Sequence, residues 1–161
     1  MDVLQFALDM ELEGERYYLN QAERNADSPL KPVFDLLAKD EAKHAGIVRG
    51  KMGGTACELK ADARLADRKT LFSDLGDYKP RAEEAADQAR LYHAALELEQ
   101  RSIDLYTDLR AKAEDAQTQS LFEFLIQEET RHYQLLEDLF RFVNRPNEWV
   151  ESAEFGLREE Y

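Results

Sequence analysis

The chain contains one cysteine, three histidines, four prolines and seven glycines among 161 residues. The single cysteine, Cys57, excludes an intramolecular disulfide and a Cys-x-x-Cys metal site, and we interpret it as a free thiol. The scarcity of glycine and proline, with 43% hydrophobic and 34% charged residues, is typical of a folded, mostly helical protein. The length suits one domain with a sizeable core.

The sequence also lacks long apolar runs and an excess of positive charge. No stretch approaches the roughly 18 apolar residues that span a membrane. The first residues lack the basic and apolar regions of a secretory signal, so we expect a cytoplasmic protein. The formal net charge of −13 disfavours nucleic acid and membranes as partners. The acidic side chains either form a solvated surface or include some that face inward and bind cations.

Two of the three histidines lie in the same short pattern, Glu-x-x-His, at Glu41–His44 and at Glu129–His132. The two copies are 88 positions apart. When the first 52 residues are shifted by this distance without a gap, Glu11 falls on Glu99 and several apolar positions also coincide. Each half of the chain therefore has a helix-length segment with a Glu, followed by one with Glu-x-x-His.

Apolar residues recur at alternating steps of three and four in all four segments, which places them on one stripe of a helix. In the second segment the stripe is formed by Phe34, Leu37, Glu41, His44 and Val48. The Glu and His residues fall inside the stripe and not on the opposite face. We therefore predict four helices whose buried faces carry ionisable side chains.

Several residues indicate where these helices begin and end. Ser28 and Pro29 are a suitable N-cap and first-turn pair for the second helix, and the glycine pair 53–54 ends it. Pro80 precedes the third helix, and Pro146 follows the fourth.

The connections predict the topology. A short turn joins the first two helices, so they should be antiparallel neighbours, whereas residues 53–79 form a long crossover that should contain a short helix packed on the bundle. Two helical hairpins with such a crossover make an all-α, ferritin-like four-helix bundle over residues 1–145. Residues 146–161 should form a tail with a short docked helix.

Four carboxylates that converge inside a bundle repel one another and are costly to bury unless cations neutralise them. Two divalent metal ions balance four glutamates when both imidazoles are neutral. We predict six metal ligands: Glu11, Glu41, His44, Glu99, Glu129 and His132. Oxygen and nitrogen ligands without sulfur suit iron or manganese, and zinc could also bind. Glu41 and Glu129 are the better candidates for bridging the two ions.

Other ionisable or small residues near the stripes need separate interpretation. A single Glu-x-x-His usually lies at the surface, but two copies in register favour a metal site. Four residues should lie at the rim or surface and not bind metal, namely Glu13, His93, Glu97 and Glu128. Tyr18 and Tyr106 lie two turns beyond Glu11 and Glu99, and either fill the core or bond a ligand carboxylate.

Four stretches, ALDMELEGERYY, KDEAKHA, ALELEQRSIDLY and QEETRHY, carry a family resemblance. With them the chain resembles the rubrerythrin family of ferritin-like proteins over nearly its whole length. The resemblance implies a non-haem centre of two iron ions. It also implies reduction of hydrogen peroxide or reaction with oxygen, in defence against oxidative stress.

The chain departs from that family in two respects. Full rubrerythrins add a rubredoxin domain with four cysteines, so here the electron donor would be a separate, rubredoxin-like protein. They also carry an extra Glu one turn after the third-helix Glu, where this chain has Ser102. The six ligands match bacterioferritin equally well. Its haem-binding Met would fall within the first Glu-x-x-His, at Ala42 or Lys43, so no haem is expected.

Three functions stay open at this point. The first is a redox enzyme acting on peroxide or oxygen, for which we expect a homodimer. The second is a bacterioferritin-like ferroxidase or iron-storage protein without haem. The third is a metal-stabilised bundle that serves an interaction.

Overall fold

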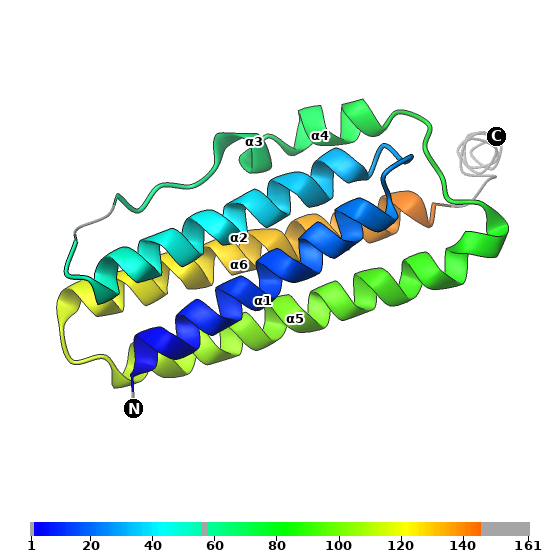
Figure 1. Cartoon of the computed structure of the whole chain (residues 1–161). Coiled ribbons are helices and arrows are strands. Elements are labelled where there is room, and N and C mark those ends of the chain that lie inside the picture. The colour runs from blue at the N-terminus through cyan, green and yellow to red at the C-terminus, as the bar shows by residue number, and fades with distance from the viewer. Residues whose placement is uncertain (1, 56–57, 146–161) are drawn as a thin grey trace, which may run out of the picture.

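Figure 1 shows the computed structural model of the chain, which describes residues 2–55 and 58–145. All regular structure within these ranges is helical, so the predicted all-α class is confirmed. Four long helices form the bundle: α1 (Val3–Arg24), α2 (Lys31–Met52), α5 (Ala85–Lys112) and α6 (Ala116–Val143). No described helix is both long enough and apolar enough to cross a membrane.

The four helices are arranged as two antiparallel hairpins, α1 with α2 and α5 with α6 (Figure 1). The connection between the hairpins contains α3 (Ala63–Ala66), α4 (Arg68–Leu75) and a 3-10 turn, η1 (Ala82–Glu84). The short helix expected in the crossover is therefore present. The predicted tail, residues 146–161, lies outside the described residues.

The predicted start of α2 was too early. The helix begins at Lys31, three residues after Ser28, and the Ser28 hydroxyl oxygen accepts a hydrogen bond from the Leu30 N–H at 3.1 Å in the turn before the helix. Pro32 falls at the second helical position, where the missing N–H has no intrahelical partner to lose. Similarly, α5 begins only after η1 and not directly after the proline that precedes it.

Two apolar clusters fill the interior, one on each side of a polar layer. On α2, for example, Leu37 belongs to one cluster and Val48 to the other, and the Glu41–His44 pair lies between them. The same order recurs on α6, where Leu125 and Leu136 enclose the second pair. The apolar stripe read from the spacing is thus the buried face of each helix.

The crossover is attached to the outside of α2 and α6 (Figure 1). Leu75 of α4 is buried in the first apolar cluster. Arg68 forms an ion pair with Asp138 of α6, and the Lys43 ammonium of α2 donates a hydrogen bond to the carbonyl of Lys60. This segment therefore covers the side of the bundle where α2 and α6 meet.

Leu136 gives a direct test of the core, because its side chain is fully buried in the first cluster. We expect Leu136→Ala to lower the free energy of unfolding by about 2–5 kcal/mol, from lost apolar contacts and a cavity. Leu19→Ala is the matched control in another helix, since Leu19 is 51% exposed, and should cost less than about 0.5 kcal/mol. Chemical denaturation measures both. Equal losses in the two variants would contradict this core assignment.

Candidate metal centre

The six predicted ligands converge in one buried layer between the apolar clusters. Each of the four long helices contributes: α1 supplies Glu11, α2 Glu41 and His44, α5 Glu99, and α6 Glu129 and His132. None of the six is more than 3% exposed. The three-residue spacing within each Glu-x-x-His puts both side chains on one side of their helix, so one turn offers two ligands.

The ligand atoms form two groups of four, and within each group all atoms lie within 4.8 Å of one another. One group is Glu11, Glu41, His44 and Glu129, and the other is Glu41, Glu99, Glu129 and His132. Glu41 and Glu129 belong to both of these groups, whereas each histidine belongs to one of them, and His44 also forms a third, three-residue group with Asp40 and Glu128. If two ions were bound, the shared carboxylates would be available to both ions and each imidazole to one.

Several buried atoms of this layer have no hydrogen-bond partner, namely Glu11 Oε2, His44 Nδ1, Glu99 Oε2 and both carboxylate oxygens of Glu129. An unpaired buried polar atom costs about 1–3 kcal/mol, and more when it is charged. Divalent cations bound by these atoms would remove that cost and balance the charge. The donor set, oxygen and nitrogen without sulfur, suits iron or manganese and also accepts zinc. The residues therefore fit a dinuclear metal centre.

Two tyrosines hold the terminal carboxylates. The Tyr106 hydroxyl donates a hydrogen bond to Glu11 Oε1 at 2.7 Å, and the Tyr18 hydroxyl donates to Glu99 Oε1. Burial, together with the adjacent carboxylates, raises the pKa of both phenols well above the ordinary value, so they stay protonated and donate. Of the two interpretations left open by the sequence, the structure supports both: the rings fill the core and the hydroxyls bond ligands.

Two small residues adjoin the layer, at positions related by the repeat. A Cβ atom added at Gly14 would lie 3.0 Å from Glu41 Oε2, so this glycine leaves the space that the bridging carboxylate occupies. Ser102 is buried, and its hydroxyl donates to the Leu98 carbonyl at 3.1 Å. A side chain larger than a hydrogen at position 14 would displace Glu41.

Two buried carboxylates contact the outer, Nε2 atoms of the histidines, and the sequence did not predict that either would be buried. Glu128, predicted to be exposed, is only 3% exposed and forms an ion pair with Arg131. Asp40, which is not among the predicted site residues, is 2% exposed and bonds His132. Both directly precede the Glu of a Glu-x-x-His and are 88 positions apart, so the repeat contained a signal for them. The other residues expected at the surface, Glu13, His93 and Glu97, are exposed.

Electrostatics divide the glutamates of the metal-free layer into two kinds. Burial and the neighbouring carboxylates raise the pKa of Glu41 and of Glu129 well above the ordinary value. Burial also opposes the charged form of Glu11, but the charge of His44 and hydrogen bonds within the layer outweigh it and lower the pKa to about 2. The two shared carboxylates thus hold protons, whereas Glu11 is ionised.

The imidazoles carry the balancing charge. Burial lowers the pKa of His44, but the charge of Glu11 and interactions with the adjacent carboxylates together outweigh burial and raise the pKa well above the ordinary value. The same holds for His132, where Glu99 is the main cause of the increase. The pKa of Glu99 is correspondingly lowered, because the charge of His132 and hydrogen bonds outweigh burial. In the metal-free layer these shifts favour the protonated form of the two imidazoles and of the shared glutamates, and the ionised form of Glu11 and Glu99.

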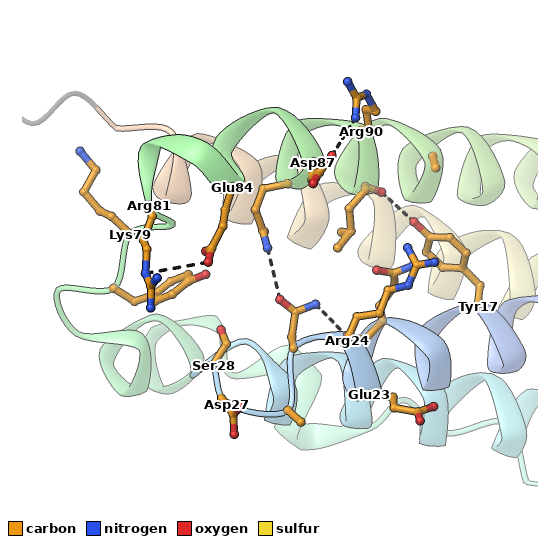
Figure 2. A pocket seen from close by; sticks show the side chains of 17 residues that line it. Tyr17, Glu23, Arg24, Asp27, Ser28, Lys79, Arg81, Glu84, Asp87 and Arg90 are labelled. Carbon is orange, nitrogen blue, oxygen red and sulfur yellow. Dashed lines mark hydrogen bonds and ion pairs between the residues drawn. The ribbon is translucent and has the colours of Figure 1, made fainter.

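A cavity of about 990 Å³ opens at the end of the bundle, beside the α1–α2 turn and the start of α5 (Figure 2). None of the six ligands lines it. Charged side chains at its mouth pair with one another, as Arg81 does with Glu84 at 3.9 Å. Tyr17 lines the cavity and packs edge-on against Tyr18, with ring centroids 5.4 Å apart. The cavity is thus distinct from the six predicted ligands, and Tyr17 in its wall packs on Tyr18, whose hydroxyl bonds Glu99.

The fold and the layer define a class, the ferritin-like helical bundles with a buried cluster of glutamates and histidines. The family model described as Rubrerythrin matches residues 2–140, and the chain belongs to the rubrerythrin family. No curated protein and no solved structure matches the chain. The resemblance stated from the sequence is thus confirmed. The family indicates a non-haem di-iron protein, and the buried cluster of glutamates and histidines fits one.

Metal loading should release protons, because two divalent ions carry the same charge as the four protons they replace. When divalent metal is added to metal-free protein at pH 7, we expect about four protons to be released per pair of ions bound. Titration in unbuffered solution at constant pH measures this, with a protein-free addition as the control. Release of one proton or none would contradict the protonation pattern described above.

The same pKa shifts make the stability of the metal-free protein depend on pH. The four groups with raised pKa stabilise the folded state below their ordinary values, 4.5 for Glu and 6.5 for His, and lose this contribution as the pH rises. Glu11 acts in the opposite direction, and its contribution is lost only as the pH falls towards about 2. We therefore expect the Tm of the metal-free form to fall between pH 6 and pH 9. The metal-bound form should change less, and parallel declines would argue against linkage through this layer.

Proposed function

We propose that the protein is a cytoplasmic non-haem di-iron oxidoreductase that reduces hydrogen peroxide or oxygen in defence against oxidative stress. The observation that carries this proposal is the buried layer in which two groups of four ligand atoms share Glu41 and Glu129. Two adjacent ferrous ions, when bound, supply the two electrons that cleavage of one O–O bond requires. Zinc would fit the same ligands but has no redox chemistry to offer.

The chain's own residues would divide the work by position. One ion would be held by Glu11 and His44, the other by Glu99 and His132, with the shared glutamates between them. The tyrosine hydroxyls occupy one oxygen of each terminal carboxylate and leave the other oxygen for metal. The apolar clusters on both sides keep bulk water from the layer and strengthen its electrostatic interactions.

Sustained turnover also requires an electron donor. Reduction of one peroxide to two waters consumes two electrons and two protons, so the ions must be reduced again after each cycle. One cysteine cannot form a four-cysteine iron centre. We propose that a separate, rubredoxin-like protein supplies the electrons to a homodimer.

A second candidate function uses the same ligand layer. Six ligands of this kind would also serve a ferroxidase or iron-storage protein without haem. Assembly distinguishes the two: storage requires a cage-sized particle, whereas the oxidoreductase needs only a dimer. Size-exclusion chromatography with light scattering decides between them.

The shared carboxylates provide the test of the metal site. We expect Glu41→Ala with Glu129→Ala to abolish binding of two ions, because each residue contributes to both groups. Metal analysis of protein loaded without oxygen measures the stoichiometry, with Glu13→Ala, an exposed position on α1, as the control. Retention of both ions at wild-type affinity would show that the ligands are assigned wrongly.

The proposed chemistry has its own test. One equivalent of hydrogen peroxide should oxidise the reduced di-iron protein, and continued turnover should need an added donor. Ser102→Glu should raise the peroxide rate relative to the oxygen rate, because it restores the acidic residue present in full rubrerythrins. Ser102→Ala is the control for loss of the hydroxyl. Stopped-flow mixing measures both rates. An unchanged ratio of the peroxide rate to the oxygen rate in Ser102→Glu would show that position 102 does not determine the oxidant.

A further inference from the structure

The cavity at the end of the bundle contains buried hydrogen-bond acceptors without a donor (Figure 2). Gln21 lines the cavity and is only 6% exposed, yet its Oε1 atom has no hydrogen-bond partner among the described residues. Gln88 Oε1 is in the same situation, although the amide nitrogen of Gln88 donates to Asn25 Oδ1 at 3.2 Å. Because buried amide oxygens normally accept a hydrogen bond, the cavity suits a group that donates one.

The cavity is also a part of this acidic chain where a negative group meets little repulsion. The whole chain has a formal net charge of −13, whereas the charged residues that line the cavity balance one another. Four are basic and four are acidic: Arg24, Lys79, Arg81 and Arg90 against Glu23, Asp27, Glu84 and Asp87. Arg81 and Arg90 form ion pairs within the lining, but Arg24 has no ion-pair partner among the described residues.

Arg24 is the basic side chain that is placed to attract an acidic group. Figure 2 shows it extending towards Tyr17 in the cavity wall, while the carboxylates of Glu23 and Asp27 point away. Burial raises the pKa of Tyr17 to about 12, and the nearby charge of Arg24 opposes this increase. The inner wall of the cavity therefore offers a neutral phenol, unpaired amide oxygens and one unpaired positive charge.

The chain continues from α6 close to this cavity. The ring of Phe140, in the last turn of α6, lies 5.3 Å from the ring of His93, and the next residue of α5, Ala94, lines the cavity. Pro146 cannot extend α6, because proline has no N–H for the helical hydrogen bond and clashes with the preceding turn. Residues 146–161 would span about 24 Å as a helix and more as an extended chain, so the cavity is within their reach.

This segment carries the groups that the cavity would bind. Trp149 is the only tryptophan of the chain, and its indole N–H can only donate, so it needs an acceptor when it is buried. The segment also contains one arginine and five glutamates, a formal charge of −4. The glutamates are Glu148, Glu151, Glu154, Glu159 and Glu160. Its donor and its negative charge complement the unpaired acceptors and Arg24.

We propose that residues 146–161 bind in the cavity of their own chain, with the Trp149 indole N–H donating to Gln21 Oε1 and acidic side chains facing Arg24. The bound segment would cover Tyr17, whose ring packs on that of Tyr18, and would close this end of the bundle to water. The inference goes beyond the proposed di-iron function and does not rest on it.

Trp149 is a direct probe, because all tryptophan fluorescence of the full chain comes from it. In the wild type we expect blue-shifted emission and protection from the quencher acrylamide, with metal and without it. Gln21→Leu removes the acceptor, and Arg24→Glu replaces an attraction by a repulsion. Each should raise the undocked fraction roughly 2- to 10-fold, measured as the rate at which chymotrypsin cuts beside Trp149.

Arg16→Glu is the matched control, since it makes the same change of charge at an exposed position of α1 outside the cavity, and it should behave as the wild type does. An exposed Trp149 in the wild type would overturn the proposal. So would a shielded Trp149 that neither Gln21→Leu nor Arg24→Glu releases, because the segment would then bind elsewhere. Shielding that is lost on dilution would mean that the segment binds a second copy of the chain, which also overturns it.

Gln21 is buried, so its replacement could disturb the fold, and circular dichroism checks each variant. Should Gln21→Leu not fold, the comparison of Arg24→Glu with Arg16→Glu decides, because both arginines are exposed. Equal cutting rates in these two variants would then contradict the proposal. None of these results bears on the di-iron centre, which the metal analysis tests separately.

Discussion

Six ionisable side chains are buried in one layer of the bundle, and the rest of the structure depends on how their charge is neutralised. Apolar clusters on both sides exclude water, so a net charge in the layer would be very costly. Protons on the shared glutamates and the imidazoles reduce this charge in the metal-free layer, and divalent ions would do the same if they were bound. Metal binding would therefore be linked to protonation and to folding.

Residues around the layer contact several of the ligands. Tyr18 and Tyr106 bind the terminal carboxylates, and Gly14 leaves the space that Glu41 needs. Asp40 lies behind both imidazoles, under the crossover. These contacts come from different helices, so the site requires the whole bundle and not one motif. Such preorganisation reduces the rearrangement that metal binding demands.

Membership of the rubrerythrin family and the geometry of the layer agree on the kind of centre the chain can hold. We propose that the choice of oxidant depends on groups beside the ligands. The Ser102 hydroxyl is engaged with the backbone carbonyl of Leu98, at a position where full rubrerythrins have an acidic side chain. In the proposed chemistry, the residue at position 102, one turn after Glu99, therefore influences which oxidant reacts. The six ligands influence only which metal ions are bound.

The sequence by itself determined the helices, their buried stripes and the six clustered residues, because periodicity and an ungapped repeat are properties of neighbouring positions along the chain. The tertiary structure decided which residues at the edge of a stripe are buried. Glu128 and Asp40 each lie beside a ligand, and spacing alone places such positions as readily in solvent as in the interior. They are buried because α2 packs on α6 and the crossover covers the junction. Ser28 is a similar case at a helix end, since a suitable cap residue does not show which turn it closes. Contacts between distant segments settle these questions, and no local pattern encodes them.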